Sequence, residues 1–169
     1  DIRILSGATI DDPEDNVNVH DLAQSFADGY LTGPNGPEIR HHDMDRAYYQ
    51  VQADRVSMPK RSSFNNPEGY YATLFHELGH STGHESRLGR FDEKQRLAAF
   101  GSEDYSKEEL VAELTASFLC AESGIDNTRE HHASYIASWL RVLRDDMSMV
   151  SKAATKAQKA ADLVLAAST

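Results

Sequence analysis

Apolar residues recur three and four positions apart along much of the chain, and this spacing predicts helices. The predicted helices cover residues 16–28, 67–83, 106–124 and 127–143. An alanine- and lysine-rich tail extends the helical pattern to about residue 166, either as part of the fourth helix or as a separate one. Helices are therefore expected to make up most of the fold.

The second of these helices has the clearest boundaries. Asn66 is a favourable N-cap, Pro67 suits the first helical position, and Gly83 is a suitable end. Its apolar stripe consists of Tyr71, Leu74, Phe75 and Leu78. This stripe predicts that one face of the helix is buried in the core, which leaves the opposite face for polar side chains.

The third helix is expected to begin at Ser106, because Ser106-Lys-Glu-Glu109 spells a capping box. A polar loop over residues 85–105 precedes it, and Gly124 marks its end. The helix therefore follows the second one after a long connection.

Short β-prone runs occur before the second helix. The runs 46–51 and 54–58 are separated by two residues and predict a β-hairpin that Pro59 closes. Residues 2–5 are expected to form another short strand, and the prolines and glycines of 33–37 predict a loop. The expected fold class is α+β, mainly helical, with a small antiparallel sheet or hairpin packed on the second helix.

Length and composition limit the class of protein. A chain of 169 residues, of which 40% are hydrophobic and 26% charged, fits a single domain over residues 1–169. No apolar run approaches the roughly 20 residues that a membrane-spanning helix needs, so no membrane partner is expected. Asp1 stands in place of an initiator methionine, which suggests the C-terminal part of a larger protein.

Charge and cysteine content argue against a nucleic-acid-binding segment and against a disulfide-rich protein. Seventeen basic and 27 acidic residues give a net charge of −10, which repels nucleic-acid phosphates, so this segment alone is not expected to bind DNA. Cys120 is the single cysteine, so no disulfide scaffold can form, and a reducing cytoplasm fits. Its apolar neighbours favour a small core residue over a nucleophile.

The second helix carries a metal-binding pattern. His76-Glu-Leu-Gly-His80 is an H-E-x-x-H motif, and residues four apart on a helix lie about 6 Å apart along its axis, so both imidazoles can reach one ion. Glu77 is rotated by about 100° from His76, where it can accept a proton from water. Gly79 permits close approach of a substrate or of neighbouring backbone. The alternative is a pair of exposed or core histidines.

A catalytic zinc site needs a third protein ligand. His84 continues the four-residue spacing but lies about 12 Å from His76 along a continuous helix. In the metzincin pattern H-E-x-x-H-x-x-G-x-x-H, the third histidine falls at Ser86. His84 therefore needs a helix break near Gly83 to act as a ligand, and otherwise lies near the helix end or orients a ligand.

An acidic ligand from the third helix is the other candidate. Glu109 and Glu113 lie one turn apart on one face, and the small Ala112 permits close helix packing. One carboxylate can bind the metal while the other orients a ligand histidine. The alternatives are capping with Ser106 for Glu109, and a solvated face for Glu108 and Glu113.

The transition state of amide hydrolysis also needs a hydrogen-bond donor for the developing alkoxide. The candidate donors are Tyr105, His131, His132 and Tyr135. Packing or ordinary surface placement is the alternative for each.

Three sequence blocks, in order, resemble the zincin-like metallopeptidase domain of ArdC-type antirestriction proteins, which is related to domains of TraC-type conjugative primases and phage polyvalent proteins. The blocks are 70–88, 105–113 and 132–139, within a resemblance over residues 38–165. The resemblance implies a gluzincin-like site in which Glu109, in an E-x-x-A pattern, is the third ligand. It also implies cytoplasmic action on mobile elements or their hosts, with nucleic acid bound only through an N-terminal domain outside this segment.

We therefore expect a zinc-dependent hydrolase, a metallopeptidase of the antirestriction type, with one Zn²⁺ ion or another divalent transition metal. Glu77 takes a proton from water and returns it to the leaving amine. A peptide or protein is the expected substrate, paired in extended form along the edge of the predicted hairpin. The rival hypothesis is a metal-stabilised domain that binds a DNA-processing partner without turnover.

Overall fold

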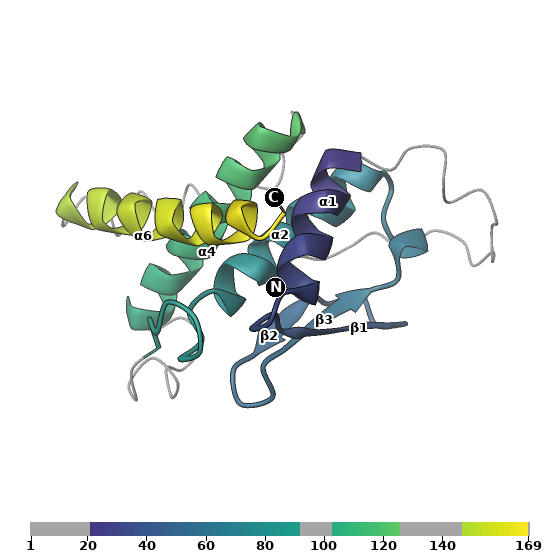
Figure 1. The fold of residues 1–169 in the computed structure, drawn as a ribbon, viewed down its shortest axis with the longest axis horizontal. Helices are drawn as coiled ribbons and strands as arrows, with labels where there is room; N and C mark the ends of the chain where they lie inside the picture. Colours follow the sequence, from purple (N-terminus) through teal and green to yellow (C-terminus); the bar gives the residue numbers. More distant parts are fainter. Residues whose placement is uncertain (1–20, 92–102, 126–146, 169) are drawn as a thin grey trace.

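The computed structural model describes residues 21–91, 103–125 and 147–168. It is an α+β fold in which the helices lie together on one side of a small sheet (Figure 1). The elements are α1 (Asp21–Thr32), β1 (Glu38–His42), β2 (Tyr48–Gln50), β3 (Arg55–Pro59), the 3-10 helix η1 (Arg61–Ser63), α2 (Pro67–Ser81), α4 (Glu103–Ser123) and α6 (Met147–Ala166). The expected fold class, mainly helical with a small sheet, is confirmed.

The sheet has the order β1-β3-β2 and is mixed. β2 and β3 pair in antiparallel fashion with Tyr49 opposite Val56, which confirms the predicted hairpin. β1 adds a parallel strand on the other side, with Ile39 opposite Val56. The sequence did not indicate this strand, because Ile39 is the one aliphatic residue in Glu38–His42.

Helix α2 begins and packs as its sequence predicts. The side chain of Asn66 accepts a hydrogen bond of 2.7 Å from the backbone N–H of Gly69, and Pro67 is the first helical residue. The helix ends at Ser81, two residues before Gly83. The stripe residues are all 1% exposed or less: Tyr71, Leu74, Phe75 and Leu78. They pack in one core cluster with side chains of α1, β3 and α4.

Helix α1 extends further towards the C-terminus than its prediction. It runs to Thr32 rather than ending near residue 28, and its side chains Ala23, Phe26, Ala27 and Tyr30 face the core. The turn over residues 33–37 follows, as expected from its prolines and glycines. The chain then enters β1 directly.

Helix α4 corrects the prediction of a capping box. It begins at Glu103, so Ser106 lies inside the helix rather than at its N-cap. The Glu109 carboxylate faces α2, where it contacts two histidines, so this tertiary contact replaces the local capping pattern. Gly124, with φ of +77°, follows the end of the helix as predicted.

Helices α2 and α4 approach each other closely beside the polar face of α2. A Cβ atom on Gly79 would lie 3.1 Å from both the Cα atom and the carbonyl oxygen of Ala112. This confirms the expected close approach at both small residues. Helix α4 also packs against α6. Helix α6 is formed by the alanine- and lysine-rich tail, which was predicted to be helical.

Several predictions fall outside the described residues. These are the strand at 2–5, the start of the first helix, and the helix over 127–143. None of the helices in the described segments has the length and apolarity needed to cross a membrane.

Candidate metal centre

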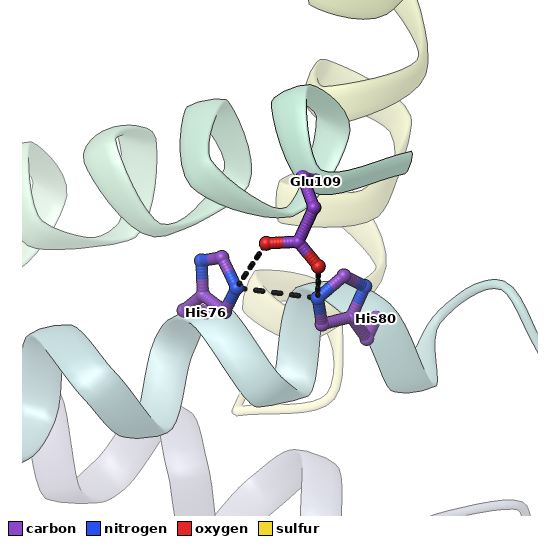
Figure 2. A group of neighbouring side chains, drawn as sticks. All are labelled: His76, His80 and Glu109. Atoms are coloured by element: carbon purple, nitrogen blue, oxygen red, sulfur yellow. Dashed lines mark hydrogen bonds and ion pairs between the residues drawn. The ribbon is translucent and has the colours of Figure 1, made fainter. Parts of the chain in front are cut away.

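Two histidines of α2 and one glutamate of α4 converge at the interface between these helices. Figure 2 shows His76 and His80 one turn apart on α2, with Glu109 reaching towards both from the facing helix. One donor atom from each residue lies within 4.8 Å of the others, which marks them as a group able to hold a metal ion among the described residues. The structure thus brings together the three residues that the sequence proposed as ligands.

The distances between the donor atoms match a small tetrahedral site. Two ligands about 2.1 Å from one ion at a tetrahedral angle lie roughly 3.4 Å apart. The Nε2 atoms of His76 and His80 are 3.2 Å apart. Two oxygens of Glu109 lie 3.5 Å from His76 Nε2 and 3.2 Å from His80 Nε2. Two imidazoles and a carboxylate at this spacing fit the three protein ligands of a catalytic zinc ion.

The second ring nitrogen of His76 faces another carboxylate of α4. His76 Nδ1 is 3.0 Å from Glu113 Oε2, and both side chains are buried. A carboxylate accepts the N–H at this position, which leaves Nε2 free to offer its lone pair towards the site. This is the arrangement that the sequence proposed for Glu113.

His80 has a comparable neighbour that sequence reasoning placed on a solvated face. Glu108 is buried, and its Oε1 atom lies 3.6 Å from His80 Nδ1. The guanidinium of Arg90, from the segment after α2, binds the same carboxylate at 2.7 Å. The acidic pair Glu108-Glu109 was the available signal, since adjacent positions on a helix point about 100° apart and can reach different atoms.

The carboxylates control the protonation of both histidines. Burial alone would lower the pKa of His76, because it disfavours the charged imidazolium, but hydrogen bonds to Glu109 and Glu113 raise it to about 9. Burial acts likewise on His80, and there the charge of Glu109 together with the close contacts to the carboxylates of Glu108 and Glu109 raises the pKa to about 10. The same negative charge attracts a divalent cation.

Two carboxylates at the site have opposite pKa shifts. Burial alone would raise the pKa of Glu109, but the charge of His80 and hydrogen bonds to both histidines hold it well below its usual range. Burial raises the pKa of Glu77, although the two histidines act in the other direction. Glu109 is therefore suited to remain an anion, whereas Glu77 holds a proton more readily than an exposed glutamate does.

Among the described histidines, His84 does not belong to this group of donor atoms. His84 lies beyond the end of α2, where its Nδ1 atom is 2.8 Å from Ser86 Oγ and 3.8 Å from Asp54 Oδ2. Tyr105 lies in the first turn of α4 and is half-buried. The remaining candidate donors lie outside the described residues: His131, His132 and Tyr135.

Comparison with known families gives one broad match. The model of a family described as zincin-like metallopeptidase matches residues 30–156. DNA primase TraC of Escherichia coli is 42% identical over 137 residues, which are 81% of this chain and 12% of TraC. Protein y4eC of Sinorhizobium fredii is 43% identical over 128 residues, which are 75% of this chain and 40% of that protein. The chain thus spans less than half the length of either relative.

Solved structures of the antirestriction protein ArdC from the R388 plasmid are similar over nearly the whole chain. The Mn(II)-bound structure has a TM-score of 0.71 and 39% identity, and the match covers 99% of this chain and 56% of ArdC. The metal-free structure has a TM-score of 0.66 and 40% identity, and covers 98% of this chain and 53% of ArdC. The similarity therefore extends from the sequence to the arrangement of the helices and sheet.

Proposed function

This chain belongs to the zincin-like metallopeptidase family, and on that basis we propose that it is a divalent-metal-dependent hydrolase that cleaves peptide bonds. His76, His80 and Glu109 are the proposed ligands of one ion, and Glu77 is the proposed general base. The observation that carries this proposal is the convergence of two imidazoles and one carboxylate from two helices, with one donor atom from each residue within 4.8 Å of the others.

Zinc is the ion that the donor set favours, and manganese is the alternative. Two imidazoles and one carboxylate are a common ligand set of catalytic zinc. The Mn(II)-bound structure of ArdC supports a divalent ion in this family without selecting zinc. When bound, such an ion supplies Lewis acidity, which polarises a substrate carbonyl and makes a water molecule more acidic.

The side chains around the ion have separate proposed tasks. Glu77 accepts the proton of the attacking water at its carboxylate and delivers it to the leaving amine. Glu113 holds the N–H of His76 so that the opposite ring nitrogen faces the ion. The buried setting of both glutamates keeps bulk water from competing for these hydrogen bonds.

The proposed substrate is a peptide or protein in the cytoplasm, within the processing of mobile DNA. The names of TraC and ArdC, a DNA primase and an antirestriction protein, support that setting. Nucleic acid is a partner only through other parts of a longer protein, because the net charge of this segment is −10. β2, the outer strand of the β2–β3 hairpin, is the proposed place for an extended substrate, because β1 already pairs with β3.

Substitution of the general base tests the function. Glu77→Gln is expected to retain one bound divalent ion but to lose cleavage of an unfolded protein such as casein, detected by mass spectrometry of the fragments. Glu122→Gln, an exposed change on α4, is the matched control and should cleave like the wild type. If Glu77→Gln keeps metal and full cleavage, Glu77 is not the base.

The rival function is a metal-stabilised domain that binds a DNA-processing partner without turnover. It predicts that Glu77→Gln keeps the full biological effect of the wild type in an antirestriction assay. Loss of that effect with metal retained supports hydrolysis instead.

A further inference from the structure

We propose that Arg90 and Glu108 form a positioning pair that orients His80 for metal binding, and this inference rests on the metal centre proposed above. Neither residue is a ligand in that proposal. Their role would be to fix the ring of His80, as Glu113 does for His76, and to tie the segment after α2 to helix α4.

The contacts of Arg90 join the two helices on both sides of His80. Its side chain is 6% exposed and binds both oxygens of Glu108, with Nε 3.3 Å from Oε2 and an Nη2 contact of 2.7 Å to Oε1. The same guanidinium donates to the carbonyl oxygen of Gly79 at 2.8 Å and to the hydroxyl of Thr82 at 2.6 Å. One planar group thus holds the backbone before His80, a side chain after it, and the carboxylate beside it.

The two ring nitrogens of His80 face adjacent glutamates with different tasks. Nε2 is 3.2 Å from Glu109, and Nδ1 is 3.6 Å from Glu108, which is an ion-pair distance. Because an ionised carboxylate only accepts hydrogen bonds, Glu108 favours a proton on Nδ1 and leaves Nε2 to offer its lone pair to an ion. An oriented N–H of this kind commonly tunes a metal-ligating histidine.

An arginine suits this position because Glu108 needs a fixed counter-charge. Four glutamates are buried around the site: Glu77, Glu108, Glu109 and Glu113. A buried carboxylate is costly unless it is paired and hydrogen-bonded. The fork of Arg90 supplies two donors in one plane, whereas a lysine offers a single point charge that cannot grip both oxygens.

The path of the chain allows Arg90 to reach this place because residue 83 lacks a side chain. The backbone N–H of Arg90 donates to the carbonyl oxygen of Gly83 at 2.9 Å, so the segment folds back on the end of α2. A Cβ atom at Gly83 would lie 2.8 Å from the ring of Phe91 and 3.1 Å from Nη2 of Arg90. The absence of a side chain at residue 83 therefore leaves room for the side chains of Arg90 and Phe91.

A second buried arginine in the same segment provides a matched control. The side chain of Arg87 is 3% exposed, pairs with Asp54, and donates to the carbonyl oxygen of Ser81 at 2.8 Å. It therefore resembles Arg90 in burial, pairing and attachment to α2, but it joins α2 to the turn before β3 rather than to α4. The metal affinity of an Arg87 variant therefore measures the effect of loosening the segment after α2 in general.

The first test compares metal affinity among variants at the two arginines. Titration with Zn²⁺ and with Mn²⁺ is expected to give affinities about 10- to 100-fold weaker for Arg90→Met, the usual effect of losing a group that orients a ligand. Arg90→Lys, which keeps the charge without the fork, should fall between Arg90→Met and the wild type. Arg87→Lys should bind both ions like the wild type. Equal losses for Arg87→Lys and Arg90→Lys would overturn the proposal.

The second test reads the histidine ring directly. Nitrogen-15 NMR of the imidazoles is expected to show a slowly exchanging Nδ1–H on His80 in the wild type, with and without zinc. In Arg90→Met, and to a smaller extent in Glu108→Gln, this proton should exchange faster while the signals of His76 stay in place. An unchanged His80 signal in both variants refutes the positioning role.

The two tests separate this inference from the proposed function. If the wild type takes up no divalent ion, the metal centre is wrong, but the NMR comparison in the metal-free protein still decides whether Arg90 and Glu108 hold the ring. If the wild type binds metal and cleaves protein while Arg90→Met does both equally well, the metal centre stands and the positioning pair is wrong. Should Arg90→Met fail to fold, Arg90→Lys and Glu108→Gln decide both measurements.

Discussion

The two faces of helix α2 are both buried, but by different kinds of neighbour. One face is formed by apolar residues, including Phe75 and Leu78, which pack against α1, β3 and α4. The other carries His76 and His80, which face Glu109 of α4, together with the buried Glu77. A single helix of 15 residues thus joins the apolar core to the proposed metal centre.

Burial has opposite energetic consequences on these faces. Each fully buried large apolar side chain stabilises the fold by roughly 1.5–3 kcal/mol through the area it removes from water. Burial of charged or polar groups costs free energy unless hydrogen bonds, ion pairs or a bound metal compensate. The apolar face should therefore control folding with or without metal, whereas the polar face should control the metal-dependent part of stability.

The largest effect is expected from Phe75→Ala on the apolar face. The side chain is 0% exposed, and its removal leaves a cavity that lowers the free energy of unfolding by about 3–5 kcal/mol. Urea denaturation measures this loss, which should be the same with and without added zinc. Leu22→Ala, which truncates an exposed leucine, is the control and should stay within about 0.5 kcal/mol of the wild type. A loss confined to the zinc-loaded protein would break the proposed division between the faces.

The next effect is expected from Glu109→Gln, which alters the polar face from the α4 side. Loss of a ligand should weaken Zn²⁺ binding by more than the roughly 100-fold that loss of an orienting group costs. At a metal concentration 100 times the wild-type Kd, the wild type gains about 2.7 kcal/mol of stability from binding, and the variant should lose most of that gain. Thermal denaturation with and without zinc measures it. If zinc stabilises Glu109→Gln as much as it stabilises the wild type and the control Glu122→Gln, Glu109 is not a ligand.

A smaller effect is expected at Gly79, where the two faces are coupled through helix packing. The added methyls of Gly79→Val have no room beside Ala112 and Thr115, so overpacking should cost about 1–3 kcal/mol. Separation of α4 from α2 should also move Glu109 away from the histidines and weaken zinc binding. Gly79→Ala is the milder step of the series and should lie between the wild type and valine in both measurements. Wild-type zinc affinity in a destabilised Gly79→Val protein would show that helix spacing does not set the site.

The features of the molecule that depend on local sequence patterns could be predicted from its sequence. The boundaries and apolar stripe of α2 follow from local patterns: a capping asparagine, a proline at the first turn, and helical spacing. The β2–β3 hairpin follows from two β-prone runs a few residues apart. His76 and His80 were identified as candidate ligands from their four-residue spacing on one helix, and Glu109 was selected among the carboxylates of the next helix by the family resemblance.

Features that depend on distant contacts could not be predicted in the same way. The capping box at Ser106 is a local pattern, and the helix instead begins at Glu103 while Glu109 turns towards α2. β1 has little strand pattern of its own and is formed by pairing with β3. Arg90 lies in a polar segment like many surface arginines, and only the folded chain places it against Glu108. In each case a tertiary partner outweighs the local preference.

The smallest effect is expected at the N-cap of α2, which belongs to neither face. Asn66 satisfies the backbone N–H of Gly69, and Asn66→Ala should lower the free energy of unfolding by about 1 kcal/mol. Because the cap lies at the opposite end of the helix from His80, zinc affinity should remain that of the wild type. Asn66→Asp keeps an acceptor and should restore the stability, since aspartate caps as well as asparagine. Weaker zinc binding in the alanine variant, with normal binding in the aspartate variant, would show that fraying at the helix start reaches the metal centre and that the polar face depends on the whole helix rather than on its contacts with α4.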